Sequence, residues 1–256
     1  MQPFQWSAAT IKGRGHRRLD RNNQDAVSVS CTEEHLIALV CDGCGSGAHS
    51  EVGAKLGIKL LQRILVTNLG LYPQPQFWQT VRSQLLSQLK QLILSLDENV
   101  SQTISDYFLF TIVGTILTPE EATVFAIGDG VVAVNGAVKV WDYPDNAPPY
   151  IVYGLMDSHS SEWDWQFFHQ GHTAEIQSLL IGTDGVQDLI KSCDRLLPGK
   201  SEPVGELSQF WTEDRYFKNP DQLRRRLSLI NRDVHYPSLQ PGLLNDDTSL
   251  VVIRRL

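Results

Sequence analysis

The stretch from Leu36 to Leu61 constrains the fold more than any other part of the chain. It begins with an apolar run of strand length, and this run stops at Asp42-Gly43. Glycines at 43, 45 and 47 then alternate with small residues, and a helical pattern of apolar residues follows. This order predicts a buried strand with a carboxylate at its end. Because an ionised carboxylate is costly to bury without a cation or hydrogen-bond donors, Asp42 needs partners.

The composition excludes several classes of function. The 256 residues suffice for one large domain with a full core, and no linker divides them, so we expect a single domain over residues 1–256. A net charge of −7 with scattered basic residues argues against a nucleic-acid partner. No apolar run reaches the roughly 18 residues that span a bilayer, and no signal peptide is indicated. With four cysteines forming no disulfide framework, we expect a cytoplasmic protein without a membrane partner.

Two other interpretations of the glycine-rich stretch are weaker. Cys41 and Cys44 have the spacing of a zinc or dithiol site, but no second pair exists and Cys41 completes an apolar strand. Gly43-x-Gly45-x-x-Ala48 imitates a dinucleotide-binding fingerprint. Three observations argue against dinucleotide binding. Asp42 would place a negative charge beside the pyrophosphate, and no acidic residue stands about 20 residues further on. A second long helix also follows the first, where the fingerprint requires a strand.

The order of elements predicts an α+β fold. We expect strands at residues 5–12, 26–30, 35–41, 106–117, 122–127, 131–134, 138–141, 178–182 and 249–253. We expect helices at residues 48–68, 76–98, 185–190, 204–211 and 221–234. Asp129-Gly130 and Asn135-Gly136 predict tight turns of one antiparallel meander, and residues 13–24 and 142–177 are expected to be irregular. Strands and helices are segregated, which favours a layered fold over a doubly wound parallel sheet.

Acidic residues stand at the predicted ends of five strands. They are Asp25, Asp42, Asp129, Asp184 and the pair Asp246-Asp247. Asp-Gly is also a turn dipeptide, and for Asp129 the turn and the site interpretations are equally supported. If these strands share sheets with these ends together, the carboxylates converge and repel one another unless they hold cations. Oxygen ligands select Mg²⁺ or Mn²⁺, and two such ions can activate a water and neutralise a phosphoryl group.

With these positions placed, the sequence resembles the metal-dependent Ser/Thr protein phosphatases of the PP2C (PPM) family, above all the bacterial branch with a compact catalytic domain. Five motifs follow in the family order along nearly the whole chain. They are Gly15-His16-Arg17 through Asn23-Gln24-Asp25-Ala26, Val40–Gly47 with Glu51-Val52-Gly53-Ala54, Thr111–Thr115 with Ile127-Gly128-Asp129-Gly130, Thr183–Asp188, and Asn245–Ser249.

The resemblance implies a four-layer α/β/β/α sandwich, in which two central antiparallel sheets are flanked by helices. Residues 142–177 would form the variable flap region. The implied activity is that of a protein-serine/threonine phosphatase in bacterial signal transduction, with a metal-bridging hydroxide that hydrolyses phosphoserine and phosphothreonine in proteins. The implied cofactors are two Mn²⁺ or Mg²⁺ ions. The expected partners are proteins phosphorylated by a Ser/Thr kinase. The phosphatase itself is expected to be a monomer.

The resemblance also assigns roles to the acidic residues. Asp42 would bridge the two ions, aided by the Gly43 carbonyl. Asp184 and Asp246 would complete one metal site, and Asp25 would support the other, so that these four aspartates form the catalytic set. Asp129 and Asp188 match positions that the family links to a third, weaker ion.

Two departures from the family pattern bear on catalysis. Eukaryotic relatives carry a His, a candidate general acid, where Cys44 stands here, although many bacterial members also lack it. Many relatives place a phosphate-binding Arg five residues before the Asp of the first motif, where this chain has Asp20. This leaves four candidates for phosphate binding, which are Arg17, Arg18, Arg21 and His16, the last also a candidate general acid. The alternative function is a pseudophosphatase that binds phosphoproteins as a regulatory module, and a dithiol sensor at Cys41 and Cys44 is a third hypothesis.

Overall fold

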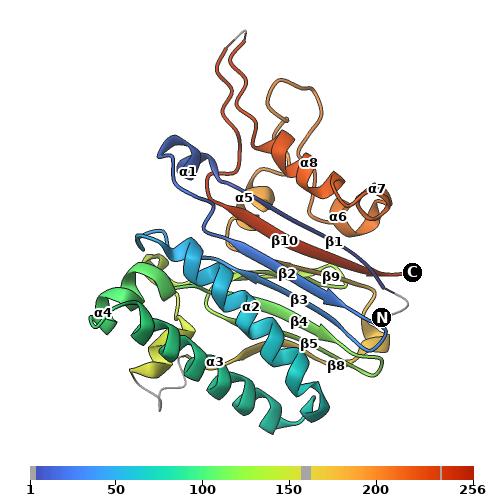
Figure 1. The fold of residues 1–256 in the computed structure, drawn as a ribbon. Helices are drawn as coiled ribbons and strands as arrows, with labels where there is room; N and C mark the ends of the chain where they lie inside the picture. The colour runs from blue at the N-terminus through green and yellow to red at the C-terminus, as the bar shows by residue number, and fades with distance from the viewer. Residues whose placement is uncertain (1–3, 157–162, 237) are drawn as a thin grey trace.

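The computed structural model describes residues 4–156, 163–236 and 238–256 and contains two five-stranded antiparallel sheets with helices on both outer faces (Figure 1). One sheet has the strand order β1-β10-β9-β6-β7 and the other β2-β3-β4-β5-β8. The strands are β1 (Phe4–Ile11), β2 (Ala26–Cys31), β3 (Leu36–Cys41), β4 (Ile112–Leu117), β5 (Glu121–Ile127), β6 (Gly130–Val134), β7 (Ala137–Trp141), β8 (Gln166–His172), β9 (Ser178–Gly182) and β10 (Thr248–Arg255).

The main helices lie on opposite sides of the two sheets (Figure 1). The β2-to-β8 sheet is covered by α2 (Ser50–Asn68) and α3 (Pro75–Leu96), followed by α4 (Val100–Thr103) and a π-helical turn, η2 (Ile104–Phe108). The β1-to-β7 sheet is covered by α5 (Val186–Lys191), α6 (Gln209–Thr212), α7 (Arg215–Lys218) and α8 (Gln222–Ile230). This arrangement confirms the predicted α/β/β/α sandwich. Among the described residues, no helix is long and apolar enough to cross a membrane.

Strand β3 shows how the layers are held together. Its residues alternate between two cores: Ile37 and Leu39 pack toward α2 and α3, whereas Leu36, Ala38 and Val40 pack between the two sheets. All six residues of β3 are buried, as expected for a strand covered on both faces. A third core lies between the other sheet and its helices. The two sheets are therefore fixed to each other and to both helical layers by apolar burial.

Five local predictions were wrong or incomplete, one of which is the helix expected at residues 204–211, where α6 begins only at Gln209. Asp129-Gly130 does not close a hairpin, because β5 and β6 belong to different sheets and the chain crosses between them there. Residues 14–18 form a short helix, α1 (Arg14–Arg18), within the expected loop, and η2 occupies part of the expected strand at 106–117. The predicted irregular region 142–177 contains edge strand β8, and its residues 157–162 lie outside the described residues. The Asn135-Gly136 hairpin is confirmed, with φ of 51° and 84°.

The strand registers bring the acidic strand ends to one end of the sandwich. Ala26 pairs with Cys41, so the residues just before β2 and just after β3 are neighbours. Gly182 pairs with both Val131 and Leu250, so the end of β9 meets the starts of β6 and β10. Asp25 and Asp42 therefore meet at this end of one sheet, and Asp129, Asp184 and Asp246 meet at the same end of the other.

Two glycines allow α2 to lie close to η2 and to the residues that follow it. A Cβ on Gly53 would lie 1.6 Å from the Tyr107 carbonyl oxygen, and one on Gly57 would lie 2.2 Å from Cζ of Phe110. No rotamer change can relieve a clash with the backbone, so the helix would have to move. This contact matters for the site because residues 109–111 bond to the loop after Asp42.

We predict that Gly53→Ala lowers the free energy of unfolding by about 1–3 kcal/mol, the usual cost of overpacking, despite the better helix propensity of alanine. The measurement is equilibrium urea unfolding of both proteins. Gly70→Ala is the matched control, because a Cβ there would meet nothing within 4 Å. Its stability should stay within about 0.5 kcal/mol of the parent. Equal stabilities for the parent and the Gly53 variant would contradict the close packing described for α2.

Candidate metal centre

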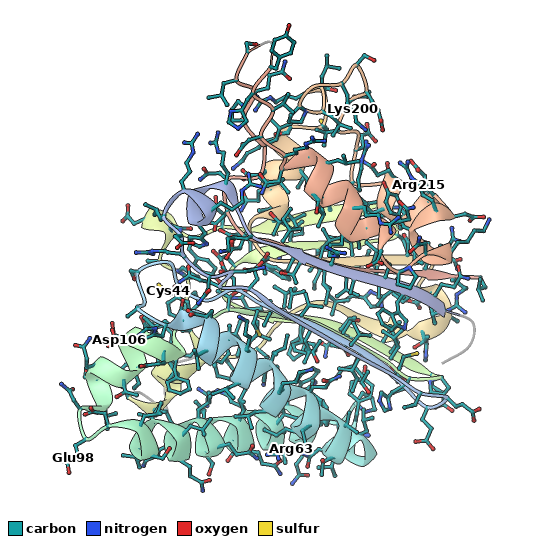
Figure 2. All side chains as sticks on the ribbon, turned by 45° about the horizontal axis from the view of Figure 1, so that its top comes forward. Cys44, Arg63, Glu98, Asp106, Lys200 and Arg215 are labelled. Carbon is teal, nitrogen blue, oxygen red and sulfur yellow. The ribbon has the colours of Figure 1, made fainter. Side chains whose placement is uncertain are left out.

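A cavity of about 440 Å³ opens at the end of the sandwich where the acidic strand ends meet. Figure 2 shows Cys44, one of its lining residues, at this end of the sheets, in the loop between β3 and α2. The cavity is lined by six of the residues selected from the sequence, which are His16, Asp42, Gly43, Asp129, Asp184 and Asp246. The structure thus brings together residues that are more than 200 positions apart in the chain.

Asp42 lies at the centre of the acidic cluster. Burial, followed by the charges of Asp25 and Asp184, raises the pKa of Asp42 well above its ordinary value. Thr111 fixes the backbone here, because its N–H donates to the Asp42 carbonyl at 2.8 Å and its hydroxyl accepts from the Asp42 N–H at 3.3 Å. The motif that begins at Thr111 therefore holds the central carboxylate in place.

Asp25 does not line this cavity but a separate one, together with residues of β1, β2 and α2. Its side chain is buried, and its Oδ2 accepts a hydrogen bond of 2.8 Å from the Thr183 hydroxyl. Burial, followed by the charge of Asp247, raises its pKa well above the ordinary value. The position fits a group that supports the cluster from within the sandwich.

A smaller cavity of about 220 Å³ adjoins the first and shares Asp184 and Asp246 with it. Asp188, the sixth predicted aspartate, lines this second cavity, and its Oδ2 accepts a hydrogen bond of 2.6 Å from the Asn245 N–H. Asp129 is on the first cavity instead. Asp129 and Asp188, which the resemblance pairs at one weak ion, thus lie on two adjoining cavities.

Asp247 has a different role from its neighbour Asp246. Its buried carboxylate accepts hydrogen bonds from the N–H groups of Gly13 at 2.6 Å and Gln24 at 2.5 Å, and its Oδ2 lies 2.9 Å from His16 Nδ1. Ligand atoms of His16, Asp246 and Asp247 lie within 4.8 Å of one another. Because backbone donors already satisfy both oxygens of Asp247, we assign it to holding the first motif against the last rather than to ligating an ion.

The three arginines expected at the phosphate lie around α1 and do not line either cavity. Arg17 pairs with Asp233 at 3.4 Å, Arg21 donates to the Gly45 carbonyl at 2.6 Å, and Arg18 is exposed. Of the four predicted phosphate ligands, only His16 reaches the cavity in this structure. These four candidates could not be ranked from sequence alone, because α1 was not expected.

The donor set fits hard divalent cations. Among the described residues, one oxygen each of Asp25, Asp129 and Asp184 is buried without a hydrogen-bond partner. Buried carboxylate oxygens that lack donors are costly, and no arginine or lysine lines the larger cavity to offset them. Oxygen-only ligands are those preferred by Mg²⁺ and Mn²⁺. The cluster therefore offers the ligand chemistry that divalent cations require.

Comparison with known proteins decides the family. A sequence model described as Protein phosphatase 2C matches residues 12–227, which include all the cavity-lining aspartates except Asp246. The chain belongs to the protein phosphatase 2C family. No curated protein matches the sequence. The metal dependence of this family agrees with the acidic cluster described above.

Several solved structures have the same fold as this chain along its described length. The serine/threonine phosphatase Stp1 from Staphylococcus aureus is 14% identical with a TM-score of 0.59, and the match covers 100% of this chain and 96% of Stp1. PppA of Pseudomonas aeruginosa is 15% identical with a TM-score of 0.60, covering 99% and 98%. The Mycobacterium tuberculosis phosphatase PstP/Ppp is 11% identical with a TM-score of 0.53, covering 98% of each chain. At such identities the likeness establishes the fold alone.

We predict that the metal-free protein loses stability as the pH rises through 6 and 7. Burial and the charge of Asp184 raise the pKa of Asp129 to about 7, and burial and the charge of Asp246 raise that of Asp184 to about 6. Both folded-state values exceed the ordinary 3.8, so the stabilising contribution is complete below about pH 4 and disappears above these pKa values.

The measurement is thermal unfolding between pH 5 and pH 8, with EDTA and with Mn²⁺. With EDTA, the melting temperature should fall by about 5 °C or more over this range, and Mn²⁺ should remove most of the decrease. Asp129→Asn should flatten the EDTA curve, whereas Asp194→Asn, which changes an exposed carboxylate, should not. A metal-free protein more stable at pH 8 than at pH 5 would contradict this account of the cluster.

Proposed function

We propose that the protein is a metal-dependent phosphatase that hydrolyses phosphoserine and phosphothreonine in proteins. The observation that carries the proposal is the set of under-satisfied carboxylates at one end of the sandwich, in a chain of the protein phosphatase 2C family. Bacterial serine/threonine phosphatases with the same fold support the substrate class. We also propose that the whole chain is one catalytic domain, which the continuous cores on both sides of each sheet support.

The acidic residues would hold two divalent ions, Mn²⁺ or Mg²⁺. Asp42, Asp184 and Asp246 would supply direct ligands with the Gly43 carbonyl, and Asp25 would support them. When bound, such a pair of ions supplies an activated water and neutralises phosphoryl charge. Asp129 and Asp188 offer further oxygens at the two cavities for a third ion. The chain's own contribution is to fix these oxygens before substrate arrives.

His16 is the residue we propose to contact the phosphate group. Its Nδ1 faces the Asp247 carboxylate at 2.9 Å, which leaves Nε2 for substrate, and its ring lines the cavity. A carboxylate at Nδ1 fixes the orientation of the ring. A protonated His16 could donate to a phosphate oxygen or to the departing serine oxygen. This proposal gives the chain a proton donor although Cys44 stands in the position of the eukaryotic His.

We predict that Asp42→Asn and Asp184→Asn each lower kcat/KM for p-nitrophenyl phosphate by about a hundredfold or more, because each removes a charge that holds the cations. Asp194→Asn, an exposed carboxylate outside the cavity, should retain the activity of the parent. EDTA should abolish turnover, and Mn²⁺ or Mg²⁺ should restore it. Activity that persists in EDTA would refute the metal-dependent mechanism. A folded protein that binds phosphopeptides but never turns them over would instead support the pseudophosphatase alternative.

A separate prediction concerns His16. Nitrophenolate is a stable leaving group that needs no proton, whereas the oxygen of serine does. If His16 donates that proton, His16→Ala should lower kcat for a phosphoserine peptide by about a hundredfold and that for p-nitrophenyl phosphate by much less. His172→Ala, at an exposed histidine on β8, is the control and should change neither. Equal losses on both substrates would show that His16 only binds phosphate or only supports the fold.

A further inference from the structure

A second groove opens beside the metal centre. It has a volume of about 720 Å³ and shares five lining residues with the acidic cavity, so the two are continuous. The shared residues are Cys44, Ser46, Asn146, Pro148 and Tyr150. None of the twelve described residues that line the groove carries a formal charge, whereas four aspartates of the cluster line the adjoining cavity. We call this feature the apolar groove.

Aromatic rings form one wall of the apolar groove. The rings of Tyr150 and Tyr153 meet edge to face at 5.6 Å, and those of Tyr153 and Trp163 meet at 5.1 Å. Tyr150 is buried and lines both cavities, so the aromatic series begins at the metal centre and extends away from it. Gln166 donates a hydrogen bond of 2.7 Å to the Tyr143 hydroxyl on the same groove. The wall is thus formed by side chains that support one another.

The contrast between the two cavities separates two tasks. The acidic cavity, with its cations, suits a phosphate group, and the apolar groove suits a side chain without charge. Residues next to each other along an extended polypeptide are only about 3.3 Å apart, so a phosphorylated residue in the acidic cavity carries its neighbours to the groove. A charged neighbour would lose hydration there without gaining an oppositely charged partner among the described lining residues, whereas an aromatic or aliphatic one gains from leaving water.

We propose that the apolar groove binds an aromatic or large aliphatic side chain that lies within two residues of the phosphorylated residue in the substrate protein. This inference rests on the proposed phosphatase function and adds the substrate class. Tyr153 and Trp163 are its specificity-determining residues, because they line the groove but not the acidic cavity. The inference rests on the described lining residues alone, and residues 157–162 lie outside the described part of the chain.

The test uses the 256-residue protein and a set of phosphoserine peptides. The peptides are identical except for one position, scanned over two residues on each side of phosphoserine, which carries Phe, Leu, Ala or Asp. Within each enzyme, kcat/KM for the Phe or Leu peptide is divided by that for the Ala peptide, so that a general loss of activity cancels. At one or more of the scanned positions, we expect kcat/KM for the Phe or Leu peptide to be about ten times that for the Ala peptide. For the Asp peptide we expect kcat/KM below that for the Ala peptide.

Substitutions in the wall should change this ratio. Tyr153→Ala and Trp163→Ala should bring it close to one. Trp163→Lys should reverse the preference and favour the Asp peptide, which a merely unfolded variant could not do. Trp6→Ala is the matched control, because Trp6 is an exposed tryptophan on β1 that lines neither cavity, and it should keep the parent ratio.

A parallel measurement keeps this inference separate from the proposed function. Equilibrium binding of the same labelled peptides, followed by fluorescence anisotropy, needs no turnover. Binding that favours the Phe or Leu peptide in a protein without hydrolytic activity would support the groove and refute the phosphatase. The opposite outcome is a protein that hydrolyses p-nitrophenyl phosphate but hydrolyses all peptides with the same kcat/KM and binds them equally. It would refute the proposed role of the groove and leave the proposed phosphatase function intact.

Discussion

The carboxylates at one end of the sandwich repel one another, and the rest of the structure must hold them together. Left to themselves, Asp42, Asp129 and Asp184 would separate and take up water. Strand pairing prevents this, because each aspartate ends or precedes a strand whose register is fixed by apolar burial on both faces. The cores between and outside the sheets thus hold the charges together, and cations are the partners that offset the resulting cost.

The same chemical group has two uses at this end of the molecule. Asp246 faces the cavity, whereas its neighbour Asp247 is turned inward and satisfied by the backbone of Gly13 and Gln24. Ligand atoms of the two aspartates lie within 4.8 Å of each other, so the two residues differ in their hydrogen-bond partners more than in their location. What distinguishes ligand from support is therefore the number of donors that each carboxylate already has.

Much of the fold and most of the cavity could be predicted from the sequence. Strand β3 and helices α2 and α3 have strong apolar patterns, and the aspartates at strand ends lie together as expected. Strand β8 could not be found, because Gln166–His172 is a half-exposed edge strand without an apolar repeat. The crossing at Asp129-Gly130 could not be found either, since a local turn signal is the same whether the next strand joins the same sheet or another. The role of Asp247 depends on contacts with residues more than 220 positions away.

The pairing of β1 with β10 bears on when the centre forms during synthesis. Eight residue pairs join these strands, and Asp246 stands just before β10, so the centre needs both ends of the folded chain. Once the ribosome has made residues 26–182, pairing is already possible among β2, β3, β4 and β5 and between β6 and β9. Strand β1 has no partner until β10 is made. Domains rich in such distant contacts fold late and slowly. A nascent chain therefore carries an incomplete acidic cluster, and a complete site can arise only once β10 has been added to the sheet.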